Sequence, residues 1–324
     1  MERIWSYFIQ LGHNMWRDET SRVEFRGPNQ TQATGRYKPE MYTDRDVWKQ
    51  VIDFLPESGF NMVVIDIGEG LLYESHPEIS IPGAWTHEEL RAELARMRAM
   101  GLEPIPKLNF SAYHDAWLGE YSHMLGTKKY YEVVRDLIDE VCVLFDNPRF
   151  FHLGLDEEYV PDHRKALTII RNEDLWYHDL YFYMQCLEKH NTRPWVWADP
   201  NRRTKDVYFK RMPKECVQSE GSYERIPPKD ENGQYASPGG LQGMIDLAKH
   251  GYDQIPCAST WACHQNLAQV MHLFETEGMV NEHLLGFLTV PWYSTDREGL
   301  YTLLNDAHRN GYARKMFERL HPEE

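Results

Sequence analysis

Three consecutive acids, Asp156, Glu157 and Glu158, follow a short apolar segment that reads FFHLGL. Carboxylates this close cannot all ionise cheaply, so the pKa of one of them is expected to rise. A raised pKa is what a general acid needs near neutral pH. We therefore predict proton transfer here, with the side chains of residues 156 and 157 on opposite sides of a strand end and Glu158 pointing outward or capping the next segment.

Polar and aromatic residues also follow other apolar segments of the chain. Aromatic faces can stack on the C–H faces of sugar rings, and carboxylates can bind sugar hydroxyls. This mixture predicts a cleft that binds carbohydrate. The candidate substrate-binding residues are His13, Asp66, Asn109, His152, Trp197, Asp199, Glu220, Tyr223, Trp261 and Trp292.

Eight short apolar segments alternate with helical patterns along the chain. Several are continuously apolar, as strands of a parallel sheet are when both faces are covered. Eight strand–helix pairs predict an α/β protein, a (β/α)8 TIM barrel formed by residues 1–324 as a single domain. No glycine-rich phosphate turn follows the first strand, which argues against a doubly wound sheet. The predicted strands lie at 4–12, 61–68, 103–110, 150–158, 193–199, 216–221, 256–261 and 284–292.

The helix predicted over residues 86–101 has clear ends, because Thr86 and Glu89 can form a capping box and Gly101 can end it. Two long polar segments, 17–42 and 222–239, follow predicted strands. Both should therefore lie on the carboxyl-end face, where such barrels build their active sites. The other predicted helices lie at 43–60, 129–145, 172–190, 201–212, 240–250, 264–278 and 295–319.

Composition narrows the possible partners and compartment. The formal net charge is −15 and no cluster of Lys and Arg stands out, so we expect neither nucleic acid nor a membrane as a partner. The first residues lack a basic region followed by a long apolar core, which predicts a cytoplasmic protein; a secreted form with its signal removed stays open. The five cysteines are scattered, without a C-x-x-C pair, so we predict buried thiols and no metal or cofactor. The oligomeric state stays open, a homo-oligomer included.

The segment HLGLDE, residues 152–157, resembles the H-x-G-G-D-E signature of glycoside hydrolase family 20, the β-N-acetylhexosaminidases. Residues 76–109, HPEISIPGAWTHEELRAELARMRAMGLEPIPKLN, look like that family's path from the second barrel strand through the third. The resemblance covers residues 60–160, and the rest of the chain only by barrel architecture. It is the resemblance of a distant relative.

The resemblance implies a catalytic role for two residues. Glu157 would be the general acid and base, and Asp156 would orient the 2-acetamido group of a terminal β-linked N-acetylhexosamine (GlcNAc or GalNAc). The acetamido oxygen, rather than a protein carboxylate, would attack the anomeric carbon in this retaining mechanism. In keeping with this, the seventh predicted strand reads PCASTW and offers no acid as a nucleophile.

The chain departs from the family pattern at several positions. Leu155 replaces the second glycine of the signature, and the Glu of the third-strand I-P-E motif is replaced in the sequence Pro106–Lys107–Leu108–Asn109. His114 could stand in for the family's histidine after that strand, and Tyr223 is a candidate to hold the acetamide. These departures concern the substrate more than the acid.

Three alternatives stay open at this point. Glu220 or Asp66 could be a second catalytic carboxylate that acts on a sugar without an acetamido group; a separation of ~5–5.5 Å would imply retention and ~6.5–9.5 Å inversion. The barrel could also bind carbohydrate without cleaving it. A metal-dependent enzyme could use His13, Asp66, His152 and Asp156, although no H-x-H or H-x-x-x-H spacing supports it.

Overall fold

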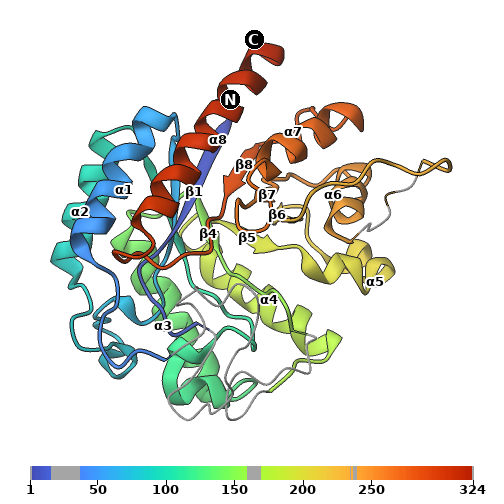
Figure 1. Cartoon of the computed structure of the whole chain (residues 1–324). Helices are drawn as coiled ribbons and strands as arrows, with labels where there is room; N and C mark the ends of the chain where they lie inside the picture. Colours follow the sequence, from blue (N-terminus) through green and yellow to red (C-terminus); the bar gives the residue numbers. More distant parts are fainter. Residues whose placement is uncertain (1, 16–36, 159–168, 234, 236–238, 323–324) are drawn as a thin grey trace.

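The computed structural model describes residues 2–15, 37–158, 169–233, 235 and 239–322 (Figure 1). Within these residues, eight parallel strands lie in the order β6-β5-β4-β3-β2-β1-β8-β7. The strands are β1 (Ile4–Gln10), β2 (Met62–Asp66), β3 (Glu103–Lys107), β4 (Phe150–His152), β5 (Arg193–Trp197), β6 (Val217–Ser219), β7 (Cys257–Ala258) and β8 (Gly286–Thr289).

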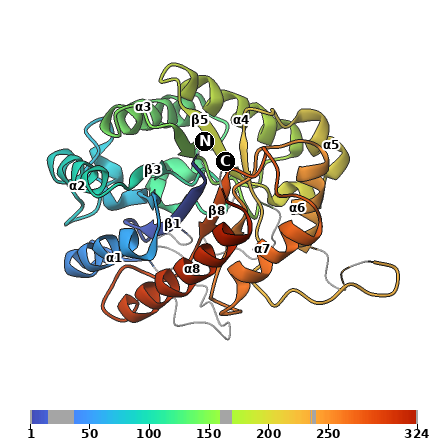
Figure 2. The same ribbon diagram turned by 90° about the horizontal axis from the view of Figure 1, so that it is seen from above.

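The two ends of this order, β6 and β7, meet through single bridges rather than a continuous ladder. Gln218 pairs with Gln254, and Gly221 pairs with Cys257. These bridges close the sheet into a barrel, and the view along it in Figure 2 shows the helices arranged around the strands. The predicted (β/α)8 barrel is confirmed, and each strand falls within its predicted segment.

An α-helix follows each strand and covers the outside of the barrel. Side-chain caps fix where several helices begin: Asp44 caps α1, and Thr86 and Glu89 form the predicted capping box of α2. None of the helices in the described part of the chain is long and apolar enough to span a membrane. The helices are α1 (Arg45–Ser58), α2 (His87–Ala99), α3 (Lys128–Leu144), α4 (Glu173–Glu188), α5 (Lys205–Arg211), α6 (Gly239–Lys249), α7 (Asn266–Thr276) and α8 (Leu300–Leu320), with short 3-10 helices η2 (Gly68–Gly70), η3 (Pro77–Ile79), η4 (Ala116–His123) and η5 (Asp199–Arg202).

The interior of the barrel is apolar along most of its length and polar at one end. Alternate residues along a strand face the same side, and those of β1, β4 and β5 form an inner core that includes Phe8, Phe150 and Trp195. Toward the carboxyl ends, Asp66 on β2 is the register partner of Lys107 on β3, which in turn pairs with His152 on β4. The fold thus sets a row of polar side chains at the rim where barrel active sites form.

We had predicted that the polar segment after β6 lies on the carboxyl-end face. Its start does so, since Tyr223 packs against Trp292 beyond β8, but its later part does not. The N–H of Ile226 donates to Oε1 of Gln269 on α7 (2.8 Å), and the hydroxyl of Tyr235 donates to Glu277 at the end of that helix (2.9 Å). The segment therefore follows the outside of α7, and both views show part of it extending away from the barrel (Figures 1 and 2). The other polar segment lies outside the described residues up to residue 36.

Candidate active site

The predicted catalytic pair lies beyond β4, in a turn whose backbone is unusual. Gly154, Leu155 and Glu157 have φ angles of 73°, 70° and 54°. Only glycine fits at 154, because a Cβ there would lie 1.9 Å from Oδ1 of Asn109. Leu155 adopts the left-handed backbone that favours glycine, at a cost of roughly 1–2 kcal/mol. Leu155 replaces the second glycine of the family signature, yet the backbone there keeps a conformation that favours glycine.

Asp156 is held by side chains of the loop that follows β3. Asn109 Nδ2 donates to Asp156 Oδ1 (3.0 Å), and His114 Nε2 lies 3.3 Å from Oδ2. Asn109 Oδ1 accepts the N–H groups of Ser111 (3.0 Å) and Leu155 (3.3 Å). The amide of Asn109, a predicted substrate ligand, thus uses both ends to orient the acid and its turn.

Glu157 reaches the same imidazole, since His114 Nε2 lies 3.1 Å from Glu157 Oε2. The prediction that the two carboxylates face opposite sides of a strand is wrong, because β4 ends at His152 and the turn brings both to one nitrogen. Asp156 is 14% exposed and Glu157 is 37% exposed. Of the pair, Glu157 has the freer access to a bound substrate.

Charge is concentrated in this group of three. Burial alone would lower the pKa of His114, but Asp156 and Glu157 outweigh it and raise that pKa to about 9. Burial would likewise raise the pKa of Asp156, yet His114, Lys107 and Asn109 hold it well below its usual value. At neutral pH the imidazole therefore carries a proton and Asp156 is ionised.

The same three residues have the spacing of a metal site. The ligand atoms of His114, Asp156 and Glu157 lie within 4.8 Å of one another, and no other such group occurs in the described part of the chain. The proposed set that included His13 and His152 is therefore not assembled there. A metal ion would have to displace the proton from His114, and this competition weakens metal binding at neutral pH. The geometry favours a bound proton.

The third acid, Glu158, points inward, so the prediction that it faces outward is wrong; the alternative, that it caps the next segment, lies outside the described residues. Its Oε1 accepts the N–H of Ala112 (2.8 Å) and a hydrogen bond from Arg171 Nη1 (2.5 Å). Burial raises the pKa of Glu158 in spite of the arginine. Within this acidic run, a raised pKa thus occurs at a buried residue outside the predicted catalytic pair.

Asp66 and Lys107 form a buried ion pair, with Nζ 2.7 Å from Oδ2. Burial raises the pKa of Asp66, and the lysine opposes that rise. Lys107 stands where the family motif has Glu, and its ammonium also lies 5.4 Å from the ring of Phe8. We had treated this lysine only as a departure; the structure places it among the polar groups of the rim.

His152 is a neutral ring in the barrel interior. Its Nδ1 accepts the N–H of Gly154 (3.1 Å), which assigns its proton to Nε2. Burial, and then the charge of Lys107, lower its pKa well below the usual value. The ring packs 4.5 Å from that of Trp197, and Nε2 has no hydrogen-bond partner among the described residues. His152 therefore packs against the aromatic side chains of the barrel interior and carries no charge.

Three of the predicted aromatic residues come together. The ring centroids of Trp197 and Trp292 are 6.0 Å apart, and those of Trp292 and Tyr223 are 6.1 Å apart. The buried Nε1 atoms of both tryptophans have no hydrogen-bond partner among the described residues. Trp261 is 37% exposed and takes part in no aromatic contact found in the described part of the chain. The structure does not bring it into this wall.

Glu220 is buried and fully engaged. Arg202 donates to both of its oxygens, from Nε at 3.0 Å and from Nη2. Asn201 Nδ2 (3.1 Å) and the N–H of Gly221 (2.8 Å) supply two further bonds. This carboxylate holds the loop after β6 rather than facing a substrate.

Asp199, the first residue of η5 after β5, is held more loosely than Glu220. Its Oδ1 lies 3.8 Å from Arg202 Nη2. Burial raises its pKa to about 7 against the pull of Arg202, helped by the negative charges of Glu220, Asp156 and Glu157. A carboxyl that titrates near neutrality beside the catalytic pair is a functional candidate.

His13 lies at the edge of the site, its ring centroid 4.8 Å from that of Tyr42. The backbone N–H groups of His13 and Asn14 donate to Glu69 Oε1 at 2.5 and 2.8 Å. Burial raises the pKa of Glu69 to about 7. Glu69 thus fixes the backbone of the segment after β1, and with it the position of His13.

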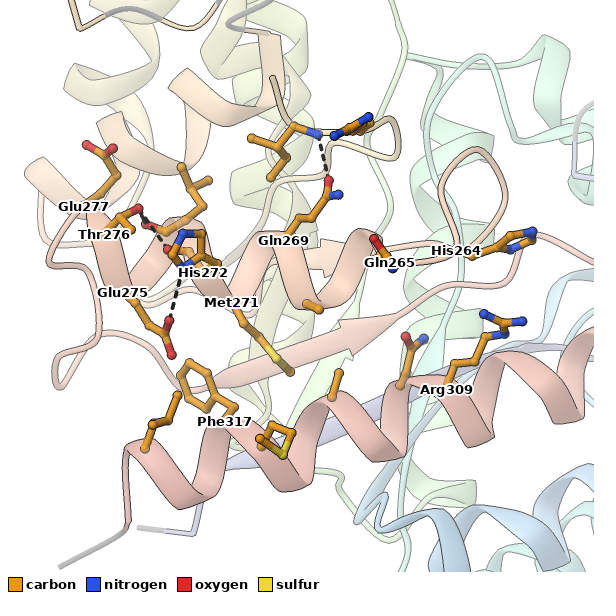
Figure 3. Close-up of a pocket in the computed structure, with 18 of the residues that line it drawn as sticks. His264, Gln265, Gln269, Met271, His272, Glu275, Thr276, Glu277, Arg309 and Phe317 are labelled. Carbon is orange, nitrogen blue, oxygen red and sulfur yellow. Dashed lines mark hydrogen bonds and ion pairs between the residues drawn. The ribbon is translucent and has the colours of Figure 1, made fainter. Parts of the chain in front are cut away.

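A separate cavity of about 1200 Å³ lies on the outside of the barrel, between α7, α8 and the segment after β6 (Figure 3). Its lining includes His264, Gln269, His272, Arg309 and Phe317. No residue of the predicted site lines it, so it is distinct from the rim described above.

No protein-family model matches the chain, and a search of curated proteins finds no match. Solved structures do match. They include the chitobiase of Flavobacterium johnsoniae (18% identity, TM-score 0.56), a GH20 exo-β-N-acetylglucosaminidase of Vibrio harveyi in complex with N-acetylglucosamine (14%, 0.59) and the GH20 β-N-acetylhexosaminidase of Streptomyces coelicolor (13%, 0.61).

The chain has the fold of these family 20 enzymes. The matches cover 86%, 98% and 94% of this chain but only 49%, 57% and 63% of those proteins, in the same order. The likeness to family 20 noted in the sequence is thereby confirmed for the fold.

Proposed function

We propose that this protein is a glycoside hydrolase that removes a terminal β-linked N-acetylhexosamine from its substrate. The observation that carries the proposal is the contact of Asp156 and Glu157 with one protonated imidazole, His114, at the rim of the barrel. The likeness to enzymes such as the Vibrio harveyi protein, solved with N-acetylglucosamine, supports an amino sugar as the substrate.

In the proposed mechanism, Glu157 acts twice. It gives its proton to the glycosidic oxygen as the bond to the anomeric carbon breaks, while the acetamido oxygen attacks that carbon. Its carboxylate then takes a proton from the water that opens the cyclic intermediate. His114, 3.1 Å away, holds the carboxyl in place.

Asp156 is suited to the substrate's amide. Its lowered pKa keeps it ionised, so it can accept a hydrogen bond from the acetamido N–H and stabilise the positive charge that develops on that group. Asn109 fixes the other carboxylate oxygen at 3.0 Å. The acid is therefore oriented before substrate binds, which lowers the cost of reaching the transition state.

The remaining predicted residues divide by their surroundings. Trp197, Trp292 and Tyr223 would pack against the sugar ring, and Asp199 would bind a hydroxyl. A second protein carboxylate as nucleophile is less well supported, because Glu220 is bound by Arg202 and Asp66 by Lys107.

Hydrolysis of aryl N-acetyl-β-glucosaminides and galactosaminides tests the proposal. With a poor leaving group, Glu157→Gln should lower kcat by ~10²–10⁴-fold, since protonation is then essential. With a 2,4-dinitrophenyl leaving group, the loss should be far smaller. Matched aryl β-glucosides, which lack the acetamido group, should not be cleaved.

Two results would contradict the proposal. Equal cleavage of the glucosides would favour a mechanism with a second carboxylate. Binding of N-acetylglucosamine without turnover of any aryl glycoside would favour a carbohydrate-binding protein.

A further inference from the structure

Glu158 links two parts of the site although it touches neither reacting group. Its side chain is only 7% exposed, and its Oε1 accepts bonds from Arg171 and from the N–H of Ala112. Ala112 belongs to the loop that carries His114, and Glu158 directly follows Glu157. One carboxylate oxygen thus connects the segment of the proposed acid to the loop of its imidazole partner.

Arg171 is a fixed point in this arrangement because the core holds it independently. Its Nε donates to Asp179 Oδ2 (2.6 Å), and its Nη2 donates to the hydroxyl of Tyr183 (2.8 Å). Its Nη1 also reaches the backbone oxygen of Phe110 (3.1 Å). The guanidinium is fully buried, so these bonds leave it little freedom to follow a moving partner.

The backbone beside Glu158 needs such support. Glu157 has a φ of 54°, in the left-handed region that costs a side-chain-bearing residue roughly 1–2 kcal/mol. Ser111 Oγ donates to the backbone oxygen of Asp156 at 2.5 Å on one side. The bonds of Glu158 hold the other side, so residues on both flanks maintain the strained conformation.

A buried carboxylate is a costly way to fill this space. Its Oε2 is buried and has no hydrogen-bond partner among the described residues. Asp179 already supplies Arg171 with a buried counter-charge. Apolar residues often replace buried ion pairs without loss of stability, so stability alone does not account for Glu158.

We propose that Glu158 is a positioning residue: through Arg171 and Ala112 it sets the distance between Glu157 and His114. The proposal rests on the proposed function for its catalytic consequence. Its geometric part, the placement of Glu157 against His114, stands on the contacts alone.

Two substitutions separate position from charge. Glu158→Gln keeps the length of the side chain and an oxygen for both bonds but removes the charge. Glu158→Asp keeps the charge but is one methylene shorter, so it cannot reach both partners unless the backbone moves. Asp179→Asn is the matched control, because it alters another buried partner of Arg171 without touching the segment of Glu157.

The first readout is the ratio of kcat values on aryl N-acetyl-β-glucosaminides with poor and with activated leaving groups. Misplacing the acid should affect only the substrate that needs a proton, and a shift of about 1 Å can cost ~10²-fold. Glu158→Asp should lose ~10–100-fold on the poor leaving group and less than ~3-fold on the activated one. Glu158→Gln should stay within ~5-fold of the wild type on both, and Asp179→Asn should leave the ratio unchanged.

The second readout needs no turnover. The pKa of His114, about 9 because of its two carboxylates, can be followed by NMR. It should fall in Glu158→Asp and stay close to the wild-type value in Glu158→Gln and Asp179→Asn.

Each outcome bears on the proposal. Greater loss in Glu158→Gln than in Glu158→Asp would overturn it in favour of a charge effect. Equal losses on both leaving groups, with His114 unmoved, would overturn it in favour of a purely structural role. If the wild type cleaves no aryl glycoside but His114 titrates as expected across the variants, the proposed function fails and the positioning role stands.

Discussion

The acids on two sides of the barrel rim look alike in the sequence and differ in their partners. After β4, Asp156 and Glu157 share an imidazole and remain partly exposed. After β6, Glu220 is buried against the guanidinium of Arg202. Arginine does not give up its proton in proteins, whereas histidine can. The partner of a strand-end acid, rather than its place in the sequence, indicates whether it can take part in chemistry.

The largest difference between the two sides should appear in activity. Asp156→Asn removes the charge that we propose faces the acetamido group, so kcat/KM should fall by ~10²–10³-fold on aryl N-acetyl-β-glucosaminides. Glu220→Gln, compared per folded molecule, should lose less than ~10-fold. The opposite order would mean that Glu220 belongs to the catalytic machinery.

Stability should show the reverse pattern. Arg202→Met leaves Glu220 buried without its cation and should cost about 3 kcal/mol, near the lower end for a broken buried pair because Asn201 and Gly221 still donate. Urea unfolding measures this cost. The control Lys49→Met breaks a pair with Asp53 in which both side chains are exposed, 64% and 42%, and should cost less than ~1 kcal/mol. Similar losses in the two variants would remove the distinction between a structural and a surface pair.

The imidazole should make the β4 side sensitive to pH. The pKa of His114 in the folded protein, about 9, lies above its ordinary value of 6.5, so the folded state binds the proton more tightly. The resulting stabilisation is complete below pH 6.5 and is lost as the pH rises toward 9. It amounts to roughly 3 kcal/mol, because each pKa unit is worth about 1.4 kcal/mol. Urea unfolding at pH 6 and pH 9.5 should show this loss in the wild type and not in His114→Asn. An equal loss in both would place the titration elsewhere.

The smallest effect is expected at the aromatic residue that lies outside the wall. Trp261→Ala should change the free energy of unfolding by less than ~0.5 kcal/mol and KM by less than ~3-fold, because its side chain is partly exposed. Trp197→Ala, within the wall, should raise KM by ~10-fold or more. A large rise in KM for Trp261→Ala would mean that Trp261 contacts the sugar, as the sequence had suggested.

Much of the fold was predictable because it follows from local patterns. Short apolar segments marked all eight strands, and caps such as Thr86 and Glu89 marked helix starts. The acidic run was predicted to lie at the rim because it directly follows one of these apolar segments. The direction of Glu158 was not predictable, because it depends on Arg171, thirteen residues further along the chain and held by α4.

The rest of the site depended on contacts between loops. Asn109 looked like a sugar ligand, yet its amide is used by Asp156 and by the turn. The position of Lys107 could have been predicted from the sequence. Residues 107 and 109 of the third segment share a face of the strand, so a lysine at 107 should point to the rim beside Asp66. His114 lies beyond any strand, so spacing alone could not place it.

Leu155, in the turn before Asp156, makes it costly to regain the second glycine of the family signature. Leu155→Gly would remove roughly 1–2 kcal/mol of backbone strain. It would also delete a fully buried side chain, and losses of this kind cost about 2–5 kcal/mol. The family's glycine is therefore not regained by a single change without loss of stability, and neighbouring side chains would have to enlarge first. A search for the family signature that requires two adjacent glycines would therefore miss proteins in which a buried leucine replaces the second glycine.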